Sequence, residues 1–318
     1  MKFALRVVAL LVLVVVAAGL IFYRYPLWVA DQQIHFHLWR EGVKSEYVDV
    51  NGYRLHYFEA SPLEGAGTPL VLIHGLGARG ENWAAMIPAL AAKGFHVYVP
   101  DLLGYGRSPQ PDVDYSISLE EQTVAAFMQA VHVPRADVGG WSMGGWIAMK
   151  LALDHPEMVD RLAIYDSAGV YFPATWQPDL FIPNDAAGVK KLYGMLSPRP
   201  FKLPDFASEA AVRKLQENAW VIRRSMSAMT NGRDLLDFRL YKISQPMLIM
   251  WGAQDELIPL SVGRSIHQSV PQSVLDVVDG CGHLAPEECP RPVIAGTVEF
   301  FKAEPAMRGG EKTFPADY

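Results

Sequence analysis

A serine near the middle of the chain stands in a pattern that could make it a nucleophile. Ser142 is the third residue of Gly140-Trp141-Ser142-Met143-Gly144, a G-x-S-x-G motif. In this motif a strand turns sharply into a helix and presents the hydroxyl, while the glycines make room for close packing. A short apolar run at residues 136–141 precedes the serine and a helical pattern at residues 144–155 follows it, as the motif requires. We predict that Ser142 is a nucleophile; the alternative is a glycine-rich turn with an idle serine.

A serine hydroxyl becomes a strong nucleophile when a neighbouring base takes its proton. His283 is the best candidate for this base, because it lies in a loop after the last predicted strand. It could accept the proton from Ser142 and return it to a leaving alcohol. His155 ends a predicted helix and His267 lies within another, so neither is placed to compete.

Short apolar runs alternate with helical patterns along the chain around these residues. The runs lie at residues 70–73, 96–99, 136–141, 162–165, 247–251 and 274–278, and the helical patterns at 83–93, 119–131, 144–155, 262–269 and 292–302. This alternation predicts an α/β fold with a mostly parallel sheet covered by helices on both faces. Such sheets carry their chemistry at the carboxyl ends of the strands. Residues 46–50 and 54–59 flank Asn51-Gly52 and form a predicted hairpin before this sheet.

A long insertion separates the runs that end at residues 165 and 251. It covers about residues 168–244, far more than one crossover needs. Apolar residues spaced by three and four positions predict a helix over 212–229, with Ser208 as its N-cap and Asn231-Gly232 as its end. We interpret the insertion as a lid over the strand ends. Its Met and aromatic side chains are expected to form mainly the core of the lid, with a substrate wall as the alternative.

Several motifs, in order along residues 47–302, resemble those of the α/β-hydrolase family. They are His74-Gly75-Leu76-Gly77, residues 101–108 (DLLGYGRS), the motif around Ser142, Trp251-Gly252-Ala253-Gln254-Asp255 and Gly282-His283. An apolar N-terminal segment, a G-x-S-M-G-G motif and a helical lid of this length most resemble the membrane-anchored monoacylglycerol lipases and their bacterial relatives. The resemblance implies the α/β-hydrolase fold with a helical lid insertion.

The resemblance also implies the acid that would complete a catalytic triad. Asp255 follows the run at residues 247–251, the place where the family carries this carboxylate. Its role would be to fix the tautomer of His283 and to stabilise the imidazolium. Asp166 ends the preceding strand, where some relatives place the acid, and is the alternative.

Two backbone N–H groups should stabilise the oxyanion. The family pattern assigns them to Met143, next to the nucleophile, and to Leu76, after the first motif strand. His74 is expected to brace the Leu76 loop rather than to react. Asp101 and Arg107 are expected to fix loop structure.

The N-terminus differs from the rest of the chain. Residues 7–23 carry no charge, Lys2 and Arg6 precede them, and Arg24 follows. At about 1.5 Å per residue they reach roughly 26 Å, the short end of a bilayer span. We predict a single-pass membrane anchor at residues 1–24; a cleaved signal peptide and a buried helix are the alternatives. These charges do not define the side of the membrane on which the domain lies. The short charged N-terminal tail favours a domain outside the cytoplasm.

The remaining chain divides into three parts by the same reasoning. Residues 25–44 form an amphipathic juxtamembrane segment, which would lie at the membrane interface or pack on the domain. The catalytic domain covers residues 45–302, and residues 303–318 form a C-terminal tail.

Composition narrows the functional classes. Half of the 318 residues are hydrophobic, 19% are charged and the net charge is −6, which excludes disorder and argues against nucleic acid as a partner. The two cysteines, Cys281 and Cys289, are too few for a disulfide scaffold or a cysteine-based zinc site; we expect free thiols, with a disulfide between them as the alternative. No metal or organic cofactor is implied, and the sequence does not define an oligomeric state.

These features together predict a serine hydrolase of carboxylic esters. A lid rich in apolar side chains beside a membrane favours an acyl chain, so monoacylglycerol or a similar lipid ester is the expected substrate. The same machinery could instead cleave a C–C bond, a lactone or an amide. A scaffold that had lost catalysis is disfavoured because Ser142, Asp255 and His283 are all present.

Overall fold

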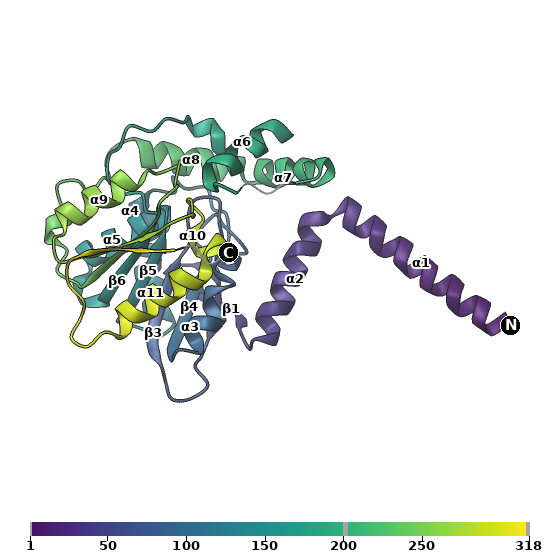
Figure 1. The fold of residues 1–318 in the computed structure, drawn as a ribbon, viewed down its shortest axis with the longest axis horizontal. Coiled ribbons are helices and arrows are strands. Elements are labelled where there is room, and N and C mark those ends of the chain that lie inside the picture. The colour runs from purple at the N-terminus through teal and green to yellow at the C-terminus, as the bar shows by residue number, and fades with distance from the viewer. Residues whose placement is uncertain (1, 200–202, 316–318) are drawn as a thin grey trace.

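One nine-stranded sheet organises the computed structural model, which describes residues 2–199 and 203–315 (Figure 1). The strand order is β1-β2-β4-β3-β5-β6-β7-β8-β9. Both pairings of β2 are antiparallel and all other pairings are parallel. The strands are β1 (Lys44–Val50), β2 (Tyr53–Ala60), β3 (Thr68–Ile73), β4 (Phe95–Pro100), β5 (Ala136–Trp141), β6 (Val159–Tyr165), β7 (Met247–Gly252), β8 (Val274–Val278) and β9 (Glu311–Phe314). The predicted mostly parallel sheet is confirmed.

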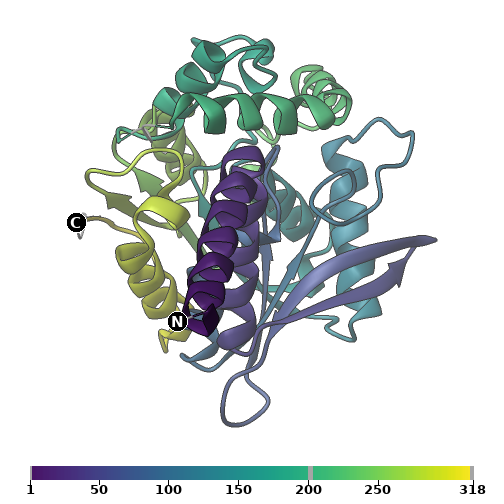
Figure 2. The same ribbon diagram turned by 90° about the vertical axis from the view of Figure 1, so that its right-hand side faces the viewer.

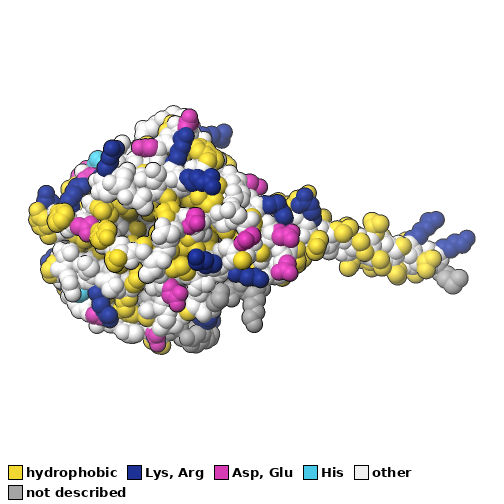
Figure 3. Space-filling view, turned by 90° about the horizontal axis from the view of Figure 1, so that it is seen from above, with side chains coloured by type: hydrophobic (Ala, Val, Ile, Leu, Met, Phe, Trp, Pro, Cys, Tyr) yellow, Lys and Arg dark blue, Asp and Glu magenta, His cyan; other side chains and the backbone are white. Residues whose placement is uncertain are grey.

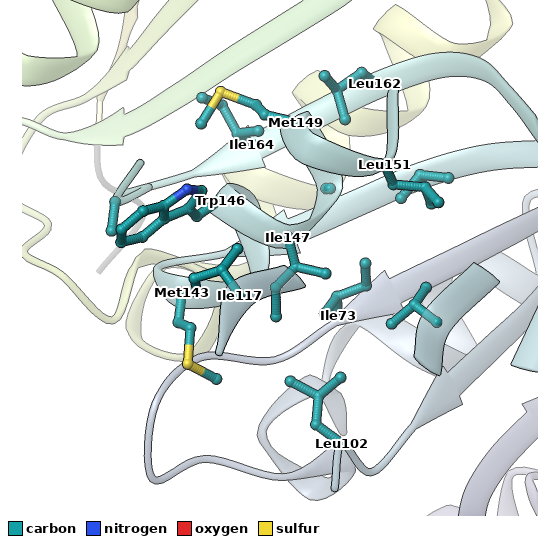
Figure 4. Close-up of a cluster of buried hydrophobic side chains, with 14 of the residues drawn as sticks. Ile73, Leu102, Ile117, Met143, Trp146, Ile147, Met149, Leu151, Leu162 and Ile164 are labelled. Carbon is teal, nitrogen blue, oxygen red and sulfur yellow. The ribbon is translucent and has the colours of Figure 1, made fainter. Parts of the chain in front are cut away.

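Every residue of β5, β7 and β8 is buried, as expected of parallel strands covered on both faces. One hydrophobic cluster joins the sheet to α4 (Ile117–Ala130), α5 (Met143–Asp154) and α9 (Leu260–Ser269). A second cluster joins the sheet to α3 (Met86–Ala91) and α11 (Pro290–Lys302). Figure 4 shows Ile147 of α5 near Ile73 of β3, and Met149 of α5 near Ile164 of β6. Burying each such side chain contributes roughly 1.5–3 kcal/mol, so these contacts fix α5 behind the serine.

The lid lies over one end of the sheet (Figures 1 and 2). It contains α6 (Ala186–Leu196), α7 (Asp205–Glu217) and α8 (Ala219–Thr230). The single helix predicted for residues 212–229 is therefore wrong, because the chain leaves helical geometry at Asn218. The Asn218 amide donates to the Gly104 carbonyl at 3.1 Å and accepts from Gln110 at 2.6 Å. Ser208 is buried inside α7 rather than capping a helix.

The N-terminal helix α1 (Lys2–Arg24) projects from the domain and buries none of its residues (Figures 1 and 3). It is long and apolar enough to cross a membrane, a property that a signal sequence shares. After Tyr25, α2 (Pro26–Arg40) buries Pro26 and Leu38 while Trp28 and Trp39 stay exposed. The segment at residues 25–44 thus packs partly on the domain.

Two further expectations are corrected by the structure. The helix expected at residues 83–93 is present but shorter: it covers only the six residues of α3, after the 3-10 helix η1 (Gly80–Trp83). The segment expected to be a C-terminal tail supplies β9, which pairs with β8 from Leu275 opposite Glu311. Four residues of mixed polarity are too short a pattern to indicate a strand, and the pairing depends on β8 more than 30 residues away in the sequence.

Candidate active site

The turn between β5 and α5 holds Ser142 in a strained backbone conformation. Its φ is 57° and its ψ is −119°, a region that L-residues rarely occupy. A Cβ added at Gly140 would come within 2.2 Å of the Gly144 carbonyl oxygen, and one at Gly144 within 2.2 Å of the Ile73 carbonyl oxygen. The Ser142 N–H donates to the Tyr165 carbonyl at 2.9 Å and so stays bonded to β6. The motif glycines are required because this turn leaves no room for side chains.

His283 connects Ser142 to Asp255 through two hydrogen bonds. Its Nε2 lies 2.9 Å from the Ser142 Oγ, and its Nδ1 lies 2.8 Å from the Asp255 Oδ2. His283 is 2% exposed and Asp255 6% exposed. The Trp141 indole N–H donates to the His283 carbonyl at 2.7 Å, which fixes the histidine loop against the serine turn.

The Asp255 carboxylate is held by backbone donors. Its Oδ1 accepts from the N–H groups of Leu257 and Ile258, each at 2.9 Å. The Oδ2 is then left for the His283 Nδ1–H, a tautomer that this network assigns. In that tautomer the Nε2 is free to accept the proton of the Ser142 hydroxyl.

Asp166, the alternative acid, has a different environment. Its Oδ1 accepts from the Gly252 N–H at 2.7 Å, and its Oδ2 is buried without a hydrogen bond. Burial, and then the charge of Asp255, hold the pKa of the Asp166 carboxyl well above its usual range, so that it favours the neutral form. The structure therefore brings Asp255, and not Asp166, into contact with His283.

Met143 and Leu76, the predicted oxyanion donors, lie near Ser142. Met143 is the first residue of α5, so its N–H has no partner within the helix. Leu76 lines the same cavity as Ser142 and follows Gly75, whose position lies so close that an added Cβ would reach 3.0 Å from the Ser142 Cβ. Their place suits donors to an oxyanion.

His74 braces the loop that carries Leu76. Its Nδ1–H donates to the Gly75 carbonyl at 2.9 Å, and its Nε2 accepts from the Leu102 N–H at 3.0 Å. Burial lowers the pKa of His74 and favours the neutral ring that these two bonds need. The expected bracing role is confirmed.

Asp101 fixes a neighbouring loop, also as expected. Its buried carboxylate accepts from the His56 ring at 2.7 Å, the Gly80 N–H at 2.7 Å and the Arg107 N–H at 2.9 Å. The Arg107 guanidinium turns away and donates to Ser45.

The expectation of free thiols is wrong, because Cys281 and Cys289 form a disulfide. Their Cα atoms are 6.3 Å apart, within the range that a disulfide spans. The short helix α10 (Ala285–Glu288) turns the chain back and brings the two residues together. The closed loop contains His283, so the bond constrains the histidine. Spacing alone does not indicate this turn.

A cavity of about 450 Å³ opens onto Ser142 and His283. Much of its wall is apolar and comes from the lid, including Phe172, Trp176, Phe181, Leu215, Ile222, Met226 and Met229. These side chains were expected mainly as lid core, and they form the cavity wall as well. Asn82, Tyr193 and Glu287 also line the cavity. Tyr193 is one of the lid aromatics for which a substrate wall was the alternative, whereas Asn82 and Glu287 were not predicted, because no motif assigns them a role.

Within residues 2–199 and 203–315, no group of three or more His, Cys, Asp or Glu side chains is arranged to hold a metal ion.

The chain belongs to the α/β-hydrolase fold family, whose model matches residues 68–290. It is 30% identical over 231 residues to the 2-hydroxymuconate semialdehyde hydrolase of Pseudomonas sp., covering 69% of this chain and 81% of that protein. It is 29% identical over 234 residues to Lipase 1 of Psychrobacter immobilis, covering 69% and 72%. Among solved structures, a bacterial membrane phospholipase A superposes with a TM-score of 0.76 at 26% identity, covering 94% of this chain and 99% of that one. Its relatives therefore include hydrolases of lipid esters and of a different substrate class.

Proposed function

We propose that this protein is a serine hydrolase of lipid esters, with Ser142 as nucleophile, His283 as general base and acid, and Asp255 as the acid that orients the histidine. The observation that carries the proposal is the hydrogen-bonded chain from the Ser142 Oγ through His283 to Asp255, open to an apolar cavity. The lipase and phospholipase among its relatives support it.

The reaction would proceed in two steps, acylation of Ser142 and hydrolysis of the acyl-enzyme. The Ser142 Oγ attacks the ester carbonyl carbon while its proton passes to the His283 Nε2, and the N–H groups of Met143 and Leu76 stabilise the oxyanion. The tetrahedral intermediate expels the alcohol, which takes the proton from His283 and leaves an acyl-enzyme. Water then attacks the acyl-enzyme with His283 as base, the Ser142 oxygen is released and reprotonated, and a carboxylic acid leaves.

The charge of the cavity favours an ester over the substrates of the other relatives. The name of the 2-hydroxymuconate semialdehyde hydrolase indicates a substrate that carries a carboxylate. A buried carboxylate needs a cationic or strongly donating partner. None of the described residues that line the cavity is Lys or Arg, and Glu287 adds a carboxyl of its own. A neutral ester with an apolar acyl chain fits these walls better than a carboxylate-bearing substrate of a C–C hydrolase.

Substrate profiling tests this function. A fluorophosphonate probe should label the wild type and not the Ser142→Ala variant. The wild type should hydrolyse monoacylglycerols and p-nitrophenyl esters of graded chain length, and should leave a 2-hydroxy-6-oxodienoate intact. Faster turnover of the dienoate than of every ester would refute the ester assignment.

We further propose that α1 anchors the enzyme in a membrane and that the catalytic domain faces an oxidising compartment. The apolar, unburied α1 supports the anchor, and the Cys281–Cys289 bond supports the compartment, because disulfides persist outside the reducing cytoplasm. In this proposal residues 1–24 are the anchor, 25–44 the juxtamembrane segment, and the lid at about 168–244 belongs to the catalytic domain.

Membrane extraction tests the anchor. The full-length chain should stay in the membrane fraction through a high-salt or carbonate wash, since hydrophobic insertion does not depend on ionic strength. Deletion of residues 2–24 should release active enzyme. A soluble wild type of full length would contradict the anchor, and a soluble form shortened near Gly19 would indicate a cleaved signal.

A further inference from the structure

Three polar side chains without a role in the proposed triad line the mostly apolar cavity. Asn82 comes from η1, Glu287 from α10 and Tyr193 from the lid helix α6, and all three line the cavity of Ser142 and His283. Helices η1 and α10 are in contact. These side chains belong neither to the proposed triad nor to the oxyanion donors, so the proposed mechanism leaves them without a role.

Asn82 and Glu287 are held in a defined orientation. The Asn82 Oδ1 accepts from the Arg79 N–H at 2.8 Å, which leaves its Nδ2 to donate to the Glu287 Oε1 at 2.8 Å. No residue in the described part of the chain makes a hydrogen bond to the Glu287 Oε2 in this structure. One carboxyl oxygen is thus fixed by protein and the other is left open.

The Glu287 side chain lines the cavity and remains solvent-exposed. It retains exposed area although protein surrounds it densely, as expected of a group on a cavity wall. This enclosure raises the pKa of Glu287 to about 7. Burial, and then the charge of Glu287, also raise the pKa of Tyr193, so its hydroxyl keeps its proton and can donate.

A site with this composition suits hydroxyl groups. Glu287 offers an open acceptor, and the Tyr193 hydroxyl can donate as well as accept. An alcohol hydroxyl both donates and accepts, so it can satisfy both groups, whereas an ammonium group only donates. An alkyl group would cover the open carboxyl oxygen without offering it a hydrogen bond, which disfavours such an alcohol.

We propose that Asn82, Tyr193 and Glu287 form a subsite for the alcohol part of the substrate and select esters of alcohols that carry free hydroxyls, such as glycerol. This inference rests on the proposed ester hydrolysis and adds the identity of the leaving group. The apolar lid wall would then hold the acyl chain. Discrimination arises in the acylation half of the reaction, because the alcohol has left before water attacks.

The experiment compares two esters of one acid, 1-monodecanoylglycerol and methyl decanoate, on the wild type and on Glu287→Gln. The amide keeps the size of the side chain and an oxygen that can accept from Asn82. At pH 8, above the raised pKa of Glu287, we expect kcat/KM for the glycerol ester to fall about tenfold or more, because a hydrogen bond to a charged group is lost. For the methyl ester kcat/KM should change less than about twofold. Glu209→Gln removes an exposed carboxylate of α7 and is the matched control, with no change on either ester.

Each outcome decides the question. Equal losses on both esters would mean that Glu287 only supports the fold, and no loss on either would mean that it does not meet the alcohol; both overturn the subsite. Preference of the wild type for decanoylcholine over the glycerol ester would assign the site to a cation and overturn it too. A wild type inactive on every ester would instead refute the proposed function.

A second measurement needs no variant. The acyl-enzyme can be captured by an alcohol in the reverse of acylation, so the subsite should act on acceptors as well. With a p-nitrophenyl decanoate donor, glycerol should divert more product from hydrolysis than 1-propanol at the same concentration. Equal or weaker capture by glycerol would overturn the proposal even if the Glu287 variant failed to fold.

Discussion

Replacing Asp255 by Asn should invert the hydrogen bonding of the histidine. The carboxylate now accepts three N–H groups: Leu257 and Ile258 on one oxygen, and the His283 Nδ1–H on the other. An amide has only one oxygen, and the two backbone donors will hold it in the place of the present Oδ1. The amide NH₂ then faces the His283 Nδ1 as a donor. The His283 ring must then adopt the tautomer with an unprotonated Nδ1 and a protonated Nε2. In this tautomer the Nε2 can no longer accept the proton of Ser142.

This wrong tautomer, together with the lost carboxylate charge, sets the size of the effect. A change of this kind in a Ser-His-Asp triad lowers kcat by about 10⁴-fold, or about 5 kcal/mol in the barrier. The assay is turnover of a p-nitrophenyl ester, with a melting curve to verify folding. Asp166→Asn is the control; it replaces a carboxyl that already favours its neutral form and should cost less than about tenfold. If Asp166→Asn proved the more damaging on folded protein, the acid would lie after β6 and the reasoning would be refuted.

Three further results are expected. Ser142→Ala should lower ester turnover by about 10⁴-fold or more while circular dichroism and melting stay close to the wild type; near-normal turnover would remove Ser142 from the mechanism. Burial raises the pKa of Glu120 from 4.5 to about 8, so the folded state keeps a proton that the unfolded chain loses, and stability falls as pH rises between these values. Glu120→Gln removes this titration, so between pH 5 and pH 9 the free energy of unfolding of the variant should fall by up to about 4 kcal/mol less than that of the wild type. A parallel pH dependence in both proteins would contradict this. Replacing Cys281 and Cys289 by Ser should lower the free energy of unfolding by about 2 kcal/mol and reduce turnover by freeing the histidine loop, measured by denaturant titration and the same ester assay; unchanged values would mean that the bond does not constrain the loop.

The parts of the structure that follow from local pattern were predictable. Apolar runs in the sequence indicate the central strands, because both faces of these strands are buried. The bounds predicted for β5 are the observed ones. The turn at Ser142 was predictable because the backbone contacts at its glycines are too close for any residue with a side chain. The same motifs led to His283 and Asp255, which the structure brings within hydrogen-bond distance.

The parts that depend on distant contacts were not predictable. The lid helix breaks at Asn218 because Gly104 and Gln110, over 100 residues earlier, bond its side chain, while the apolar spacing continues across the break. The disulfide depends on the turn of α10, and Glu287 enters the cavity because α10 lies against η1. A polar residue in a loop carries no local sign that it will face a cavity.

The short strand β9 has a consequence for solubility. It covers the unpaired backbone of β8, an apolar strand that would otherwise offer a template for pairing with other chains. β9 itself is only four residues long and carries Lys312, which pairs with Glu299 at 2.8 Å. At the opposite edge, β1 is mostly exposed and carries Lys44, Glu46 and Asp49. Both borders of the sheet thus resist edge-to-edge association, and a chain that ended at residue 310 would keep its chemistry intact yet lose enzyme to aggregation.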